Sequence, residues 1–140
     1  MARNDPFQGF RFRVEIDNAE HGAFARVKGL VRETKVETRR EGGVNDFEYK
    51  LASLTSYGNL VLERGLADDY LWSWQEDVVG GMIQRRNIAV SLQDGNANEL
   101  WRWLVQDAFP VKWTGTDLDA SSMQVLVESV EFAHHGIRKG

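Results

Sequence analysis

The strongest constraint on the fold is a period of two in the apolar side chains, which recurs along most of the chain. In FRFRVEI, residues Phe10 to Ile16, apolar side chains alternate with charged ones. Successive side chains of a strand point to opposite faces, so this spacing predicts a strand with one buried face. The other predicted strands are Ala23–Leu30, Val31–Arg40, Asn59–Arg64, Asn87–Asp94, Leu100–Gln106 and Met123–His135.

Two local signals refine this β pattern. The apolar parity changes between Val127 and Val130, which predicts a β-bulge near Glu128. Asp94-Gly95 follows a predicted strand and indicates a hairpin turn. The pattern predicts a mainly β protein built as a two-sheet sandwich or small barrel.

One helix is predicted, from Asp68 to Val79. Asp68 and the following carboxylate suit the N-cap and first turn, and Gly80-Gly81 supplies the stop. The predicted buried stripe consists of Ala67, Tyr70, Leu71, Trp74 and Val78. Trp72 lies off the centre of this stripe, about 100° from its neighbour on the helical wheel, and needs another explanation.

The predicted strand Val31–Arg40 has no apolar face. Glu33, Lys35, Glu37 and Arg39 share one face of it, and the opposite face is also largely polar. Such a strand adds little to the core of a monomer, so it suits a sheet edge, a subunit interface or a wet channel. The segment Glu41–Ser56 has weak periodicity and is predicted to be a long loop that is functional or ordered by a partner.

Composition limits the class of protein. The 140 residues fit one domain, residues 1–140, and the chain contains no cysteine, which excludes disulfides and thiol catalysis. The net charge of −4 does not favour non-specific binding to nucleic acid. The sequence shows no membrane span and no signal peptide, so we expect a soluble protein made in the cytoplasm.

Candidate metal and cofactor motifs are weak. Asp117 to Glu128 places carboxylates as a calcium loop would, but Ser122 stands where the sharp turn needs glycine. His134 and His135 are adjacent in a predicted strand and should point to opposite faces, so they cannot easily bind one metal. We therefore expect no cofactor and no metal.

No catalytic motif stands out either, and we expect a protein that is not an enzyme. Trp101 and Trp103 share one strand face, where they could stack on a sugar, although packing in a core is the commoner role of such a pair. The alternatives left open are a monomeric carbohydrate-binding β-sandwich and a barrel enzyme that acts on a small ligand.

Several stretches taken together resemble a known family. DPFQGFRFRVEID and FARVKGLVRETKVETRREGG lie in the first third of the chain, and YGNLVLERGLADDYLWSW and RRNIAVSLQD follow. AFPVKWTG and SVEFAHHGI complete the series. In this order, over nearly the whole chain, they resemble the inner tube protein of contractile injection systems, which include contractile phage tails and antifeeding-prophage-like particles.

The resemblance implies a structural subunit, made in the bacterial cytoplasm and assembled into a virion tail or an extracellular injection particle. Six copies would form a ring, and stacked rings would form a hollow tube for cargo. The implied partners are other copies of the chain, the sheath protein, the baseplate or spike hub, and the tube cap or terminator.

The resemblance also suggests roles for the unexplained residues. We expect the charged side chains Glu33, Lys35, Glu37 and Arg39 to face the lumen of the tube. The subunit and ring interfaces are expected to include Asp5, Pro6, Phe7, Arg40, Glu41, Gly42, Gly43, Tyr57 and Trp72.

Overall fold

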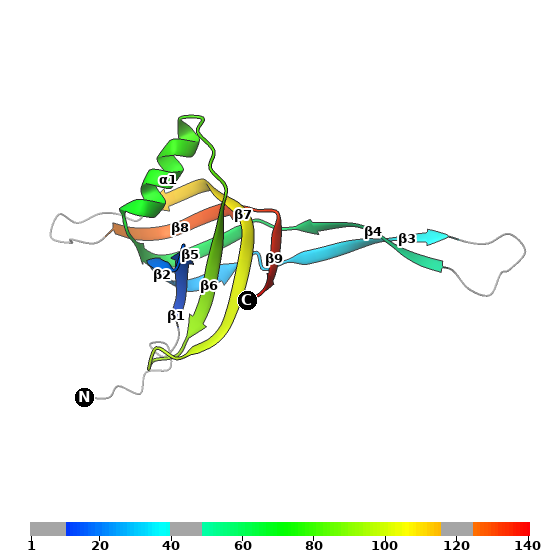
Figure 1. Ribbon diagram of the computed structural model, residues 1–140, viewed down its shortest axis with the longest axis horizontal. Coiled ribbons are helices and arrows are strands. Elements are labelled where there is room, and N and C mark those ends of the chain that lie inside the picture. The colour runs from blue at the N-terminus through cyan, green and yellow to red at the C-terminus, as the bar shows by residue number, and fades with distance from the viewer. Residues whose placement is uncertain (1–10, 40–48, 116–124) are drawn as a thin grey trace, which may run out of the picture.

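A computed structural model describes residues 11–39, 49–115 and 125–140. Six of its strands close into a barrel, with α1 on one side (Figure 1). The strands of the main sheet are β1 (Arg11–Ile16), β2 (Ala19–Lys28), β5 (Leu60–Ala67), β6 (Arg86–Gln93), β7 (Glu99–Gly115), β8 (Val125–Ala133) and β9 (Gly136–Lys139). Their order is β6-β1-β2-β5-β8-β7-β9, and a further pairing of β6 with β7 closes the barrel. The predicted mainly β fold with a small barrel and one helix is confirmed.

The long strand β7 is shared between neighbours. Its first half pairs with β6, from Glu99 opposite Gln93 to Ala108 opposite Arg86. Its second half pairs with β8, and β9 continues along that same edge of β7 from Gly136 opposite Gln106. Strand β7 extends well beyond the predicted Leu100–Gln106, because after its pairing with β6 and β9 ends it continues alongside β8 to Gly115.

The core lies inside the barrel and follows the predicted alternation. Val14 and Ile16 of β1 are fully buried, and they face buried residues from every other barrel strand. The buried apolar residues are Val14, Ile16, Phe24, Leu60, Leu62, Leu71, Trp74, Ile88, Val90, Val105, Ala108, Val127, Val130 and Phe132. Each large aliphatic side chain buried in this way contributes about 1.5–3 kcal/mol to the hydrophobic stabilisation.

Helix α1 (Asp69–Val79) covers part of this core. Asp68 is its N-cap, and the side-chain Oδ1 accepts a hydrogen bond of 3.0 Å from the backbone N–H of Tyr70. At the other end Gly81 has φ of +89°, a conformation that glycine adopts without strain. Leu71 and Trp74 are buried as predicted, and the Trp74 ring lies 5.7 Å from that of Phe132. The predicted helix and its stop are confirmed.

A separate two-stranded ribbon projects from the barrel (Figure 1). It consists of β3 (Arg32–Arg39) and β4 (Tyr49–Tyr57) in antiparallel pairing. The prediction of a loop over Glu41–Ser56 is therefore wrong for its second part, since residues 49–56 belong to β4. Strand β4 was missed for two reasons. Its described side chains up to Ser56 are all exposed, so no apolar face marks it. Its pairing with β3 also shifts register opposite Lys35, which interrupts the alternation of its side chains between the two faces.

The local β features were predicted with mixed success. The register of β7 with β8 passes from Thr114 opposite Ser129 to Gly115 opposite Val127 and skips Glu128, which confirms the bulge. The turn at Asp94 is confirmed too, because Gln93 pairs with Glu99 across it.

The boundaries of two predicted strands need correction. Strand β2 begins at Ala19, four residues before the predicted start, because Asp17 and Asn18 both have positive φ and form a tight hairpin turn. Strand β8 ends at Ala133, so His134 and His135 lie at its junction with β9 and not inside one strand.

Candidate functional site

The β3–β4 ribbon is unusual because almost nothing in it is buried. All eight side chains of β3 are exposed, including Val36, which is 56% accessible. Backbone pairing holds the two strands together, and the hydroxyl groups of Thr34 and Thr55 lie 2.8 Å apart. A two-stranded ribbon without a buried face is marginal in water by itself, so this element is suited to contact with another molecule.

The charged face of β3 also receives side chains from β4. Directly opposite residues of two paired strands share a face. Ser56 is opposite Glu33, and Leu51 is opposite Glu37. Leu51 is 43% exposed, so the face that carries the predicted lumen residues Glu33, Lys35, Glu37 and Arg39 is mixed and not purely charged.

Contacts at the root fix the ribbon to the barrel. The backbone N–H of Gly58 donates to the carbonyl of Val31 at 3.3 Å, and the carbonyl of Gly58 accepts from Nε2 of His134 at 2.7 Å. The rings of Tyr57 and His134 are 5.8 Å apart. Tyr57, predicted at an interface, thus packs partly within its own subunit. Burial lowers the pKa of His134 from its ordinary value, because a charged imidazole is less well solvated there.

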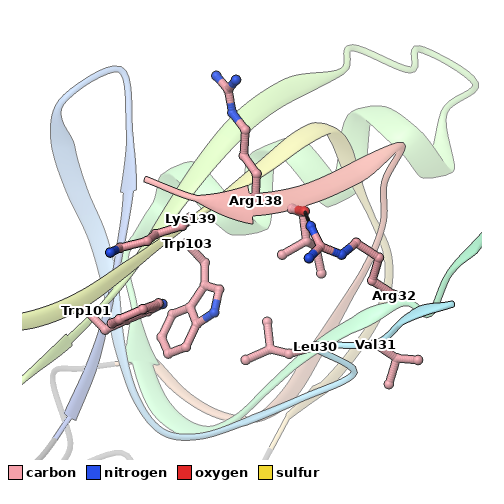
Figure 2. A pocket seen from close by; sticks show the side chains of 8 residues that line it. Leu30, Val31, Arg32, Trp101, Trp103, Arg138 and Lys139 are labelled. Atoms are coloured by element: carbon pink, nitrogen blue, oxygen red, sulfur yellow. Dashed lines mark hydrogen bonds between the residues drawn. The ribbon is translucent and has the colours of Figure 1, made fainter.

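A pocket of about 360 Å³ opens beside this root (Figure 2). Its lining residues are Leu30, Val31, Arg32, Trp101, Trp103, Ile137, Arg138 and Lys139. Trp101 and Trp103 lie on one face of β7, as predicted, with ring centroids 6.2 Å apart. Trp101 is nevertheless 42% exposed, so it is a surface residue at the mouth of the barrel and not part of the core.

Trp72 lies on the exposed side of α1. It is 45% accessible, and its ring packs edge to face on that of Trp113, with centroids 5.2 Å apart. The position off the helical stripe explains this exposure, because the stripe residues Leu71 and Trp74 turn toward the barrel instead. The sequence alone could not show that Trp113 of β7 would be its neighbour.

Other predicted positions fall outside the described residues. For the interface these are Asp5, Pro6, Phe7, Arg40, Glu41, Gly42 and Gly43. Asp117 and Asp119 of the calcium-like stretch also lie outside them.

Over the described ranges there is no group of three or more His, Cys, Asp or Glu side chains that could hold a metal ion. His134 and His135 have separate surroundings, since Nδ1 of His135 is 3.7 Å from a carboxylate oxygen of Asp107. In the same part of the chain, no helix has the length and apolar character needed to cross a membrane.

The family comparison decides what kind of protein carries these surfaces. Residues 8–138 match the model of the T4-like virus tail tube protein gp19 family. The chain belongs to this family. A tail tube protein is a structural subunit, which accounts for an exposed ribbon and exposed aromatic side chains. No match is found among the curated proteins.

Several solved structures share the fold. A chain in the six-fold symmetrised baseplate of the anti-feeding prophage is 29% identical, with a TM-score of 0.70 over 100% of this chain and 97% of that one. A chain in the extended sheath–tube complex of the PVC extracellular contractile injection system is 22% identical, with a TM-score of 0.71 over 96% of this chain and 90% of that one. Hcp1 from Flavobacterium johnsoniae is 14% identical, with a TM-score of 0.52 over 93% and 94% of the two chains.

Proposed function

We propose that six copies of this tail tube subunit form a ring, and that stacked rings form a hollow conduit through which cargo passes. The observation that carries the proposal is the β3–β4 ribbon, whose β3 side chains are all exposed in the single subunit. Lateral contact between ribbons of neighbouring copies would supply partners for its free strand edges. A closed ring of such heterologous contacts has cyclic symmetry.

The charges of the ribbon suit the wall of a conduit. Glu33, Lys35, Glu37 and Arg39 share one face and include both signs in equal number. Burying these ions in a dry core would cost several kcal/mol for each one left unpaired. A hydrated wall with mixed charge attracts neither acidic nor basic cargo strongly. We therefore assign this face to the lumen.

Two aromatic side chains that remain at least partly accessible are assigned to contacts between subunits. Trp72 on α1 and Tyr57 at the ribbon root are the described members of the predicted interface. The remaining predicted members, in residues 5–7 and 40–43, belong to segments that border β1 and the free end of the ribbon.

The partners follow from the assemblies in which similar chains occur. Those chains come from a baseplate, a sheath–tube complex, a tube-terminating cap and a sheath–tube terminator. We propose that this subunit assembles with a sheath, a baseplate or spike hub, and a cap or terminator, in a phage tail or an extracellular injection particle. We assign it no enzymatic activity and no cofactor.

Electron microscopy of the purified protein, and of sheathed particles that contain it, tests the proposal. We expect rings with six-fold symmetry and tubes with a hollow centre. Only monomers in both samples would contradict it. A monomeric protein retained on a glycan resin would instead support the carbohydrate-binding alternative, for which the exposed Trp101 is the best candidate residue.

A further inference from the structure

The pocket at the root of the ribbon has a distinct chemistry. Two indole rings and the side chain of Leu30 face the hollow, and Lys139 lies above Trp101 (Figure 2). The Lys139 ammonium nitrogen is 4.4 Å from the centre of the Trp101 ring. Arg32 stands on the other side, where its Nη1 donates to the carbonyl of Ile137 at 3.5 Å, a bond that uses one of the five N–H donors of a guanidinium. None of the eight lining residues is acidic.

This combination selects a particular ligand. An exposed indole next to a cation binds an aromatic ring on its face, and the cation binds a carboxylate. A ligand that matches both features carries an aromatic side chain flanked by carboxylates. A sugar would match the indoles but would leave the cationic groups without a charged partner.

The chain itself contains such a ligand. Asp46, Phe47 and Glu48 are consecutive, in the segment that joins the paired residues Arg39 and Tyr49 at the free end of the ribbon. We propose that the Asp46-Phe47-Glu48 segment of one copy binds the aromatic and cationic pocket of a second copy. Phe47 would pack on Trp101 and Trp103, and the two carboxylates would pair with Lys139 and Arg32. The inference deepens the proposed assembly, on which it rests, by naming the contact.

The dimensions of the ribbon require a second copy. Arg32 lines the pocket and Arg39 lies seven residues further along β3, which at about 3.3 Å per residue separates them by roughly 23 Å. Phe47 is two residues from Tyr49, the partner of Arg39, so its Cα lies within about 7 Å of that of Tyr49. The segment therefore cannot return to the pocket at the root of its own ribbon.

The other segments outside the described residues fit the pocket less well. Residues 1–10 contain Asp5 and Phe7 but also Arg3, so their side chains are not acidic as a whole. Residues 116–124 contain Asp117 and Asp119 but no aromatic side chain. Residues 40–48 contain three carboxylates against one arginine and include Phe47.

A contact of this kind is head to tail. The ligand lies at one end of the ribbon and the pocket at the other, so every copy can offer both at once. Repetition of the contact adds subunits in one direction. This directionality is what a tube that grows from one end needs.

The first test measures binding without assembly. A fluorescein-labelled peptide of residues 44–50 is titrated into the full-length protein, and its anisotropy is followed. We expect saturable binding that weakens about tenfold or more when Phe47 of the peptide is replaced by Ala, or when Lys139→Glu or Trp101→Ala is introduced in the protein. Lys112→Glu, a matched change at an exposed lysine of β7 outside the pocket, should leave binding unchanged. Equal binding by all these variants, or none by the unaltered peptide, would overturn the inference.

The second test uses assembled particles and the absence of native cysteine. A protein with Glu48→Cys and Lys139→Cys should form a ladder of disulfide-linked oligomers in tubes under mild oxidation. The control pair Glu48→Cys with Lys112→Cys should not. Tubes without a ladder, or with the same ladder in the control, would refute this contact and leave the tube intact. If the unaltered protein forms no tubes, the proposed function fails, and peptide binding alone decides the inference.

Discussion

The indole rings of Trp72 and Trp113 meet edge to face, with centroids 5.2 Å apart and planes inclined by 84°. The pair joins α1 to the second half of β7 on the surface of the barrel. Edge-to-face pairs of this kind contribute about 0.5–1.5 kcal/mol beyond their buried area. Because Trp72 is still 45% exposed, one part of its ring stabilises its own subunit and the rest is free to contact another.

Replacement of Trp72 by Ala should therefore have two unequal effects. The free energy of unfolding of the monomer should fall by about 1 kcal/mol, from loss of the aromatic pair. Assembly should weaken by about 2 kcal/mol or more if Trp72 anchors a subunit interface. Denaturant titration measures the first effect, and sedimentation of tubes measures the second.

Trp74→Ala provides the control, because Trp74 is only 1% exposed and belongs to the core. It should cost about 3–5 kcal/mol in the monomer. If Trp72→Ala destabilises the monomer as strongly while tubes still form normally, Trp72 is not an interface residue.

The close approach of β2 and β5 depends on a glycine. A Cβ at Gly65 would lie 2.2 Å from the carbonyl oxygen of Ala23 and 2.4 Å from a ring carbon of Phe24. Gly65→Ala should therefore lower the melting temperature by several degrees, through overpacking of about 1–3 kcal/mol. Gly115→Ala is the matched control, since nothing lies within 4 Å of its added Cβ. Equal melting temperatures for the two variants would show that the backbone adjusts at Gly65 without cost.

The lumen assignment predicts a dependence on reagent size. Cysteines at Glu33 and Glu37 should react with thiol reagents of any size in the monomer, where β3 is fully exposed. In tubes they should react with small reagents but resist reagents wider than the bore. Thr34→Cys and Thr38→Cys place the thiol on the opposite face of the same strand. Their labelling in tubes should show a different dependence on reagent size. If Glu33→Cys and Glu37→Cys in tubes react equally with reagents of all sizes, they lie on the exterior.

Stability should depend on pH through His134. Burial lowers its pKa in the folded state from the ordinary value of 6.5. Between the two pKa values the unfolded chain binds more protons, so the free energy of unfolding should fall as pH drops below about 6.5. His134→Gln can still donate to the carbonyl of Gly58 but cannot titrate, so it should lose this component of the pH dependence. Identical slopes for the two proteins between pH 5 and 7 would contradict this account.

Much of the barrel could be predicted from the sequence. The alternation in β1, β5 and β6 identifies the buried residues directly, because one face of each strand must leave water while the other stays wet. The helix was predictable from Asp68, Gly80 and its apolar stripe, since caps and periodicity are local properties. The bulge near Glu128 was predictable too, because it appears locally as a change in which alternate positions of the strand are apolar.

The candidate site was harder to predict. Strand β4 is held by backbone hydrogen bonds to β3, and with little burial its sequence leaves no alternating pattern. The exposure of Trp101 could not be read from its parity, which it shares with the buried Val105 on β7. Only its position at the end of the barrel, where the strands stop covering one another, leaves it open to solvent.

The sequence by itself determined the class of fold, the course of most barrel strands, the helix and the resemblance to tube proteins, because each is recorded in the order and spacing of neighbouring residues. The tertiary structure decided which residues from distant parts of the chain meet: Trp72 with Trp113, His134 with Gly58, and Leu30 with the tryptophans and Lys139 of the pocket. These contacts depend on how the sheet curves and closes into a barrel. Closure is set by the pairing of β6 with β7 and by the bulges along the strands. The turn at Asp94 and the change of parity near Glu128 mark two of these features in the sequence, but the curvature of the whole sheet is not recorded in any one local spacing.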